Sequence, residues 1–276
     1  MRFGFIVPNF GAFGDVRGVT DLARAAEDSG WDAFFTWDHI DFENMEPNAD
    51  PWILMTSIVL ATETIRVGPM VTPLPRRHLG KLAREISTLD HLSGGRVIFG
   101  AGSGPAETPE ATAFGEPAEA RARADMVDEG LDVLCQWWGE GPVSVDGTQV
   151  SAHIDVTGPT LQQPRVPIWL AATWPNTRPI RRSARWDGVY PITSDVMGGG
   201  ITSPEDIASI VEYVSSLRTE SAPFDVVHAR SGLHGGTADD VEVYHQAGAT
   251  WWVSGTTPSE TLDDARRYIT AGPPRP

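Results

Sequence analysis

The hydrophobic pattern of the chain alternates between short runs rich in strand-forming residues and longer runs with helical spacing. In the first repeat, Phe3–Phe10 is rich in β-branched and aromatic residues, and Val19–Ser29 carries apolar residues at helical spacing before Gly30. The alternation continues to the end of the chain. Strands are predicted at Phe3–Phe10, Ala33–Trp37, Ile65–Thr72, Val97–Gly100, Ile168–Ala172, Gly188–Ile192, Phe224–Ala229 and Thr250–Val253. Helices are predicted at Val19–Ser29, Trp52–Thr62, Leu79–Leu92, Ala118–Trp138, Arg178–Arg185, from Ser203 onward, Asp239–Gln246 and Ser259–Ile269.

This alternation predicts an α/β fold, a (β/α)8 TIM barrel. Repeated strand–helix units need parallel strands with right-handed crossovers, and about eight strands close a barrel that side chains can fill. An open doubly wound sheet is the competing fold, but it would normally end after roughly five or six units. Between the fourth helix and the fifth strand, Val143–Val145 and Thr148–Val150 flank Asp146-Gly147 and predict a small hairpin. Because no linker divides the chain, we expect residues 1–276 to form a single domain.

Composition narrows the classes of partner. The formal net charge of −16 argues against nucleic acid or an anionic membrane, since both are bound through basic patches. Cys135 is the single cysteine, which excludes an internal disulfide and a zinc site with several cysteines. The start, Met1–Val7, has the pattern of a strand rather than a secretory signal, and no apolar run reaches the length of a membrane span. We therefore expect a cytoplasmic protein. The spacing of the histidines, taken separately, predicts no metal site.

Candidate chemistry lies where the predicted strands end, because that edge of a barrel carries the active site. Strand two ends in Asp38-His39, a pair suited to proton transfer, although taken alone the pattern is better explained by Asp38 as a loop cap and His39 as an exposed residue. Strand four runs into Gly100–Gly104, where a flat ligand can approach the backbone or a tight rim turn is made. Strand five precedes a helix with three arginines that would either hold a phosphate or form a solvated face: Arg178, Arg181 and Arg182.

Several longer motifs give the chain a family resemblance. They are Ala25–Asp32, Trp37–His39, Val71–Arg77, Lys81–Glu85, Thr88–Arg96, Gly100–Gly104, Pro164–Trp169 and Ala247–Thr250. Together they cover nearly the whole chain, and the chain resembles the luciferase-like superfamily. That superfamily includes bacterial luciferase, FMN-dependent monooxygenases and enzymes that use the deazaflavin coenzyme F420. The resemblance implies a flavin or deazaflavin ring across the barrel mouth.

The resemblance also implies roles for particular residues. His39, with Asp38, matches the catalytic position that faces the ring. The cofactor-binding positions are Met70, Val71 and Thr72 on a bulge in strand three, Gly102, Ser103 and Gly104 after strand four, and Ala172, Thr173 and Trp174 after strand five. The family further implies a non-prolyl cis peptide between Met70 and Val71. Two departures matter: Pro105 stands where some deazaflavin dehydrogenases have Glu, with Glu107 the nearest acid, and the loop after strand five is poor in glycine.

The expected function is hydride transfer or monooxygenation on a small organic molecule, with FMN or F420 as cofactor. Trp37-Asp38-His39 favours F420, and a separate flavin or F420 reductase is an expected partner. We also expect a homodimer that pairs through the apolar face of Leu79–Leu92, with packing of that face on the barrel as the alternative. Two alternatives are a carboxylate-based hydrolase or lyase using Asp38 and Glu107, and a flavin-binding relative without turnover. At the barrel rim His39 is expected to be exposed, so that its truncation would leave stability unchanged.

Overall fold

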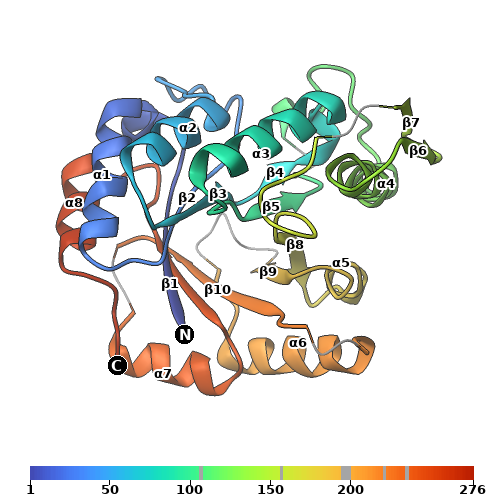
Figure 1. Ribbon diagram of the computed structural model, residues 1–276. Helices are drawn as coiled ribbons and strands as arrows, with labels where there is room; N and C mark the ends of the chain where they lie inside the picture. The colour runs from blue at the N-terminus through green and yellow to red at the C-terminus, as the bar shows by residue number, and fades with distance from the viewer. Residues whose placement is uncertain (106–107, 156–157, 194–199, 220–221, 234–235) are drawn as a thin grey trace.

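The strands form a parallel barrel, as the alternation predicts. A computed structural model describes residues 1–105, 108–155, 158–193, 200–219, 222–233 and 236–276 (Figure 1). The main sheet has the order β3-β2-β1-β11-β10-β9-β8-β5-β4, and every pairing in it is parallel. The strands are β1 (Arg2–Val7), β2 (Ala33–Thr36), β3 (Arg66–Pro69), β4 (Thr72–Pro73), β5 (Phe99–Gly102), β8 (Ile168–Trp174), β9 (Gly188–Thr193), β10 (Asp225–Ser231) and β11 (Trp251–Gly255).

The third predicted strand is divided between β3 and β4, and the division completes the ring. The peptide between Met70 and Val71 is cis, as the family resemblance predicts, and it separates the two halves. A bridge between Val67 and Val97 joins β3 to the segment before β5. The backbones approach closely here, since a Cβ atom on Gly68 would lie only 1.9 Å from the carbonyl oxygen of Ile98. The (β/α)8 barrel prediction is confirmed.

The helices surround the strands as an outer ring (Figure 1). They are α1 (Val16–Asp28), α2 (Pro51–Ala61), α3 (Leu79–Ser93), α4 (Ala120–Trp138), α5 (Thr177–Ser183), α6 (Pro204–Leu217), α7 (Ala238–Gln246) and α8 (Leu262–Thr270). Three of them begin with a capping box, in which the N-cap hydroxyl accepts from the backbone N–H of an aspartate three residues later and that aspartate side chain accepts from the N-cap N–H. The N-cap residues are Ser203, Thr237 and Thr261. None of the helices in the described ranges is long and apolar enough to cross a membrane.

The predicted hairpin between helix four and strand five is present, but its second strand begins later than expected. Strand β6 (Val143–Asp146) pairs with β7 (Ser151–Ile154), so the turn is longer than Asp146-Gly147. The cause is Glu129 of α4, whose carboxylate accepts hydrogen bonds from the backbone N–H groups of residues 148, 149 and 150 at 2.7–2.8 Å. These donors are therefore occupied by a helix side chain and not by a strand partner.

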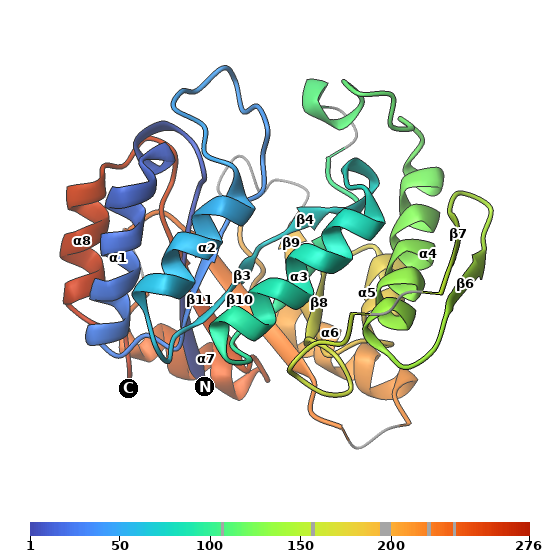
Figure 2. The same cartoon turned by 45° about the horizontal axis from the view of Figure 1, so that its top comes forward.

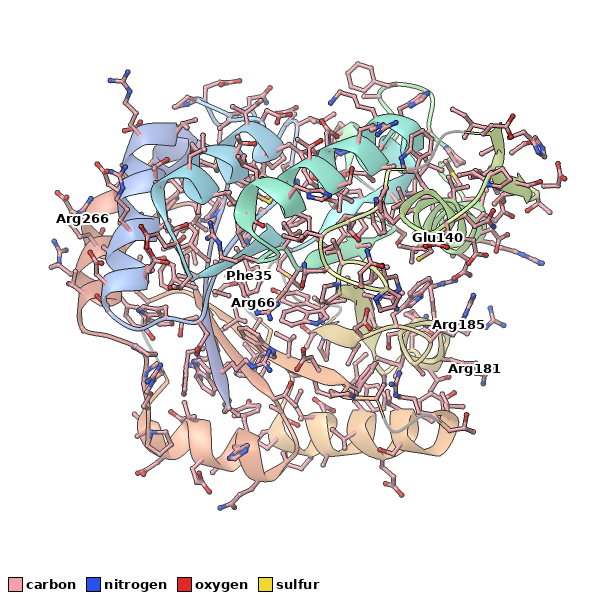
Figure 3. All side chains as sticks on the ribbon, in the orientation of Figure 1. Phe35, Arg66, Glu140, Arg181, Arg185 and Arg266 are labelled. Atoms are coloured by element: carbon pink, nitrogen blue, oxygen red, sulfur yellow. The ribbon has the colours of Figure 1, made fainter. Side chains whose placement is uncertain are left out.

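The barrel interior is filled at one end and open at the other. Towards the N-terminal ends of the strands, Trp169, Trp251 and Phe35 pack together with essentially no exposure, and Phe35 lies near the centre of the molecule in Figure 3. Towards the C-terminal ends, the interior residues Trp37, Val71, Tyr190 and Ala229 pack against this core but remain partly exposed. We call the space bordered by these four residues the barrel mouth.

The apolar face of α3 does not provide the dimer surface that the sequence suggested. Leu82, Ile86 and Leu89 are buried in the main hydrophobic core of the same chain. Among the described helices, α2 carries the two most exposed large apolar side chains, Ile53 at 65% and Leu60 at 70%. A homodimer remains a prediction, and its expected surface moves to α2.

Candidate functional site

His39 lies just after the C-terminal end of β2, in a segment that Asn9 holds in place. Asn9 is fully buried, and its side-chain oxygen accepts from the N–H of His39 at 3.1 Å. The Asn9 amide nitrogen donates to the His39 carbonyl at 2.7 Å and to the Ala49 carbonyl at 2.8 Å. Asn9, two residues after β1, therefore fixes both backbone groups of His39, so the imidazole starts from a defined position at the barrel rim.

The His39 side chain is paired with Glu110, a residue that sequence reasoning did not identify. Glu110 lies in the short 3₁₀ turn η3 (Pro109–Ala111), and its Oε1 is 2.6 Å from Nδ1 of His39. Figure 2 shows that the segments after β2 and after β5 rise on the same side of the barrel. Oε2 of Glu110 accepts from the N–H groups of Ile40 at 2.9 Å and Asp41 at 3.2 Å. The carboxylate thus ties the loop after β2 to the loop after β5.

Glu110 is ionised in the folded protein. Burial acts to raise its pKa, but the hydrogen bond and charge of His39, the charge of Arg76 and the N–H of Ile40 outweigh burial and lower the pKa to about 2. A carboxylate can only accept hydrogen bonds, so the close contact with His39 places the imidazole proton on Nδ1. Nε2 has no hydrogen-bond partner among the described residues. In the neutral ring, Nε2 is then free to accept a proton.

Asp38 is buried in a cluster of charges behind His39. Its Oδ1 accepts from Arg76 at 2.7 Å and from Arg77 at 2.5 Å, and its Oδ2 accepts from the hydroxyl of Thr72 at 2.8 Å. Arg76 also reaches Oε2 of Glu110 at 3.1 Å, so one guanidinium bridges both carboxylates. Because both Asp38 oxygens are occupied, this carboxylate does not offer the free group that hydrolysis needs. Glu107, the second acid considered for hydrolysis, lies outside the described residues.

Aromatic rings enclose the His39 imidazole. Phe42 meets it edge-on with ring centroids 5.1 Å apart, and Phe10 and Trp37 lie at 5.8 and 5.9 Å. The His39 side chain is consequently only 19% exposed, which corrects the expectation of an exposed rim residue. Its removal would leave a hole among these rings and take away the hydrogen bond to Oε1 of Glu110. We therefore expect His39→Ala to lower stability, contrary to the sequence-based prediction.

The predicted cofactor residues near β3 and β5 gather on one wall of the barrel mouth. Met70 is almost fully buried and Val71 is partly exposed, whereas Thr72 turns its hydroxyl towards Asp38. A Cβ atom on Gly102 would lie 3.0 Å from Cγ2 of Val71 and 3.3 Å from Cβ of Ala171, so glycine keeps this wall clear. The Ser103 carbonyl accepts from buried Arg123 at 3.0 Å, and Gly104 follows with a φ of +70° that favours glycine.

The predicted residues at the end of β8 face different directions. Ala172 is buried in the outer core, and alternation along the strand turns its neighbour Thr173 towards the interior. Trp174 donates from its indole nitrogen to Asp206 at 2.8 Å, which anchors the strand end to α6.

The arginines of α5 do not converge on a phosphate site. Arg181 bonds the hydroxyl of Tyr213 at 3.2 Å, and Arg182 pairs with Asp128 at 2.6 Å. In Figure 3, Arg181 and Arg185 extend outward from α5 at the edge of the molecule. Of the two alternatives for this face, the contacts of Arg181 and Arg182 favour the solvated one, because neighbouring helices supply their partners. Across the described ranges, no three His, Cys, Asp or Glu side chains cluster in a way that would hold a metal ion.

Solved structures with this architecture are redox enzymes of several kinds. The coenzyme F420-dependent tetrahydromethanopterin reductase of Methanopyrus kandleri superposes with a TM-score of 0.75 at 17% identity, covering 98% of each chain. A monooxygenase of Streptomyces bottropensis superposes with a TM-score of 0.77 at 18% identity, covering 98% of this chain and 96% of that one. At these identities the likeness establishes the fold.

Sequence comparison identifies the family. An uncharacterized protein of Mycobacterium tuberculosis is 29% identical over 98% of this chain and 96% of its own length. The F420-dependent glucose-6-phosphate dehydrogenase of Microbacterium testaceum is 32% identical over 57% of this chain, and the match spans 47% of that enzyme. The sequence profile of the luciferase-like monooxygenases matches residues 1–185. This chain belongs to the luciferase-like monooxygenase family.

Proposed function

We propose that the protein is an oxidoreductase that binds a flavin-type ring in the barrel mouth and transfers hydride to or from a small organic molecule. The observation that carries the proposal is the His39–Glu110 pair at the rim, with Nδ1 and Oε1 2.6 Å apart and Nε2 without a partner among the described residues. A histidine held in one tautomer beside an ionised acid is suited to move a proton when a substrate hydroxyl is oxidised or a carbonyl reduced.

The mouth is suited to a flat, largely apolar ring. Its interior side chains Trp37, Val71 and Ala229 are apolar and partly exposed, and Gly102 leaves the wall beside Val71 without a side chain. Ligand sites of this kind are mostly apolar, with a few polar groups that fix orientation. Met70, Val71, Gly102, Ser103, Gly104 and Thr173 would hold the ring, with Thr72, Ala172 and Trp174 supporting the walls from behind.

The bound ring would supply the two-electron chemistry, and the chain would supply orientation and proton transfer. His39 would accept or return a proton at Nε2, while Glu110 keeps the other ring nitrogen protonated. Asp38 would act as a positioning residue, because it holds Arg76, which in turn contacts Glu110. Coenzyme F420 is the favoured cofactor: relatives such as the Microbacterium testaceum enzyme are named F420-dependent, and Trp37-Asp38-His39 resembles that branch.

A second candidate is monooxygenation with FMN, for which a separate reductase would supply reduced cofactor. The family match and the similar fold of the Streptomyces bottropensis monooxygenase favour it. The same mouth residues would hold either ring, so cofactor preference is a question for measurement.

The test is a titration of the purified protein with F420 and, separately, with FMN, followed by changes in cofactor fluorescence. We expect saturable binding of F420 that is stronger than binding of FMN. The loaded protein is then screened against alcohols and carbonyl compounds for bleaching or recovery of the ring absorbance. His39→Gln should keep most of the affinity and lose about 10²–10⁴-fold in turnover. The matched control is His153→Gln, which changes an exposed hairpin histidine. A protein that binds neither ring refutes the proposal, and binding without turnover would assign it to the non-catalytic relatives.

A further inference from the structure

Tyr190 occupies the side of the barrel opposite His39. Strand β9, which carries Tyr190, is four places from β2 in the order β2-β1-β11-β10-β9, and four steps are half the circumference of an eight-stranded ring. Tyr190 pairs with Ala171 of β8 and packs against the interior cluster that contains Trp169. Its side chain therefore points into the barrel and not towards the helices.

The hydroxyl of Tyr190 differs from those of the other tyrosines. Tyr244 donates to the Thr202 carbonyl at 2.8 Å, Tyr268 bonds Ser254 at 3.1 Å, and Tyr213 accepts from Arg181. Tyr190 has no hydrogen-bond partner among the described residues, although burial raises its pKa to about 12. A phenol with that pKa stays protonated at physiological pH and remains a hydrogen-bond donor. Because the residue is also partly exposed at the barrel mouth, this donor is available to a bound molecule.

The residues around Tyr190 indicate which kind of molecule its side chain would contact. The residue remains partly exposed and lines a pocket at the ends of β9 and β10 together with Ile192, Ala229 and Ser231. Beneath it the barrel is closed by the packed rings of Trp169 and Phe35. Trp37, Val71 and Ala229 border the barrel mouth together with Tyr190, so the phenol is the polar group among apolar interior side chains. A molecule that enters the mouth as far as the packed rings would bring its deepest atoms to Tyr190.

We propose that Tyr190 binds the redox ring by donating a hydrogen bond from its hydroxyl to a carbonyl oxygen of the ring. This inference rests on the proposed function. FMN and F420 share a pyrimidinedione edge, which carries the ring carbonyls, whereas the bodies of both rings are largely apolar. The carbonyl edge therefore lies deepest, against Tyr190, and the substrate approaches from the His39 side. Cofactor affinity, and not substrate affinity, depends on the phenol.

The experiment compares the wild-type protein with Tyr190→Phe, which removes only the oxygen. Affinity for F420 and for FMN is measured by fluorescence titration, and the absorption spectrum of the bound ring is recorded. A neutral hydrogen bond contributes roughly 2- to 10-fold in affinity, so Tyr190→Phe should weaken binding by about that factor. Its spectrum should also shift, because a hydrogen bond to the carbonyl perturbs the ring. Tyr213→Phe on the outer helix α6 is the matched control and should bind like wild type.

The melting temperature of the free Tyr190→Phe protein should not fall, because the lost hydroxyl has no partner in the described chain. If wild type binds a ring and Tyr190→Phe binds it with the same affinity and spectrum, the role of Tyr190 is refuted and the proposed function stands. If only the KM for substrate rises, the phenol contacts substrate and the assignment to the ring is wrong. If wild type binds neither ring, the proposed function fails and the inference fails with it.

Discussion

Replacing Glu110 by glutamine should release His39 from its single tautomer. The substitution keeps the shape of the side chain and removes its charge. In the wild-type protein the 2.6 Å contact joins Nδ1–H to a carboxylate, and hydrogen bonds to charged groups contribute about 1.5–3 kcal/mol. This energy corresponds to a preference of about 10- to 100-fold for the Nδ1–H tautomer, at about 1.4 kcal/mol for each factor of ten. In Glu110→Gln the amide oxygen must take the Oε2 position, where Ile40, Asp41 and Arg76 donate, so the amide NH2 group faces Nδ1 and the preference for the Nδ1–H tautomer should be lost.

The assay is long-range ¹H–¹⁵N NMR of the histidine rings, which separates the two tautomers by nitrogen chemical shift without any substrate. The His39 signals are assigned by their loss in His39→Gln. Glu119→Gln serves as the control, because that glutamate is exposed and its side chain caps nothing. A wild-type protein with the proton on Nε2 would refute the reasoning. So would a Glu110→Gln protein whose tautomer ratio matches wild type.

Glu110→Gln should also change how the free energy of unfolding depends on pH. The pKa of Glu110 is lowered from 4.5 to about 2 in the fold, so the unfolded chain binds the proton first as pH falls. The stabilisation from this carboxylate is therefore complete above pH 4.5 and is lost between pH 4.5 and about 2. At about 1.4 kcal/mol per pKa unit its upper size is about 3 kcal/mol. Glu110→Gln should be less stable than wild type at pH 7, and the gap should narrow in this acid range.

Two further predictions concern stability and assembly. His228 is fully buried against Tyr244, and burial together with the charge of Arg230 lowers its pKa from 6.5 to about 3, with Asp240 opposing. Between those pH values only the unfolded chain takes up the proton, so the wild-type protein loses stability as the pH falls. The free energy of unfolding of His228→Phe, measured in urea, should therefore rise relative to wild type by about 2 kcal/mol from pH 8 to pH 5. A difference between the two proteins that does not change with pH would contradict this. Light scattering should give the mass of a dimer for the wild-type protein and the mass of a monomer for the double substitution of Ile53 and Leu60 by Asp. A wild-type monomer at micromolar concentration would count against the homodimer.

The order of strands and helices was predictable because each element buries a face of defined period. Runs of alternating Val, Ile and Phe separated by helical repeats leave little freedom in the arrangement of the elements once eight parallel strands must close into a barrel. The hairpin shows where local patterns fail. Asp146-Gly147 suits a two-residue turn, but Glu129, distant in sequence, takes the backbone donors that the expected strand would use. A side chain from another element thus overrides a local turn preference.

The sequence predicted His39 of the candidate site but not its partner Glu110, because a contact between distant segments leaves no local pattern. His39 was found because it follows a strand directly, and strand ends are positions that sequence patterns mark. Glu110 lies 71 residues away in a loop, and no periodic signal joins it to His39. The exposure of His39 was misjudged because two rings close over it: Phe10 comes from the loop after β1, and Phe42 comes from the same loop as His39. Pairings between loops depend on the closed barrel and are visible only once it is built.

The charge cluster behind His39 fixes the carboxylate that the imidazole contacts. Two carboxylates, Asp38 and Glu110, face two guanidinium groups, Arg76 and Arg77, so the cluster balances its charge without His39. Arg76, at 3.1 Å from Oε2 of Glu110, offsets part of the negative charge of the carboxylate that the His39 imidazole contacts. Asp38 holds Arg76 in this position, so under the proposed function the buried aspartate would act through Arg76 and Glu110 and not on the substrate itself.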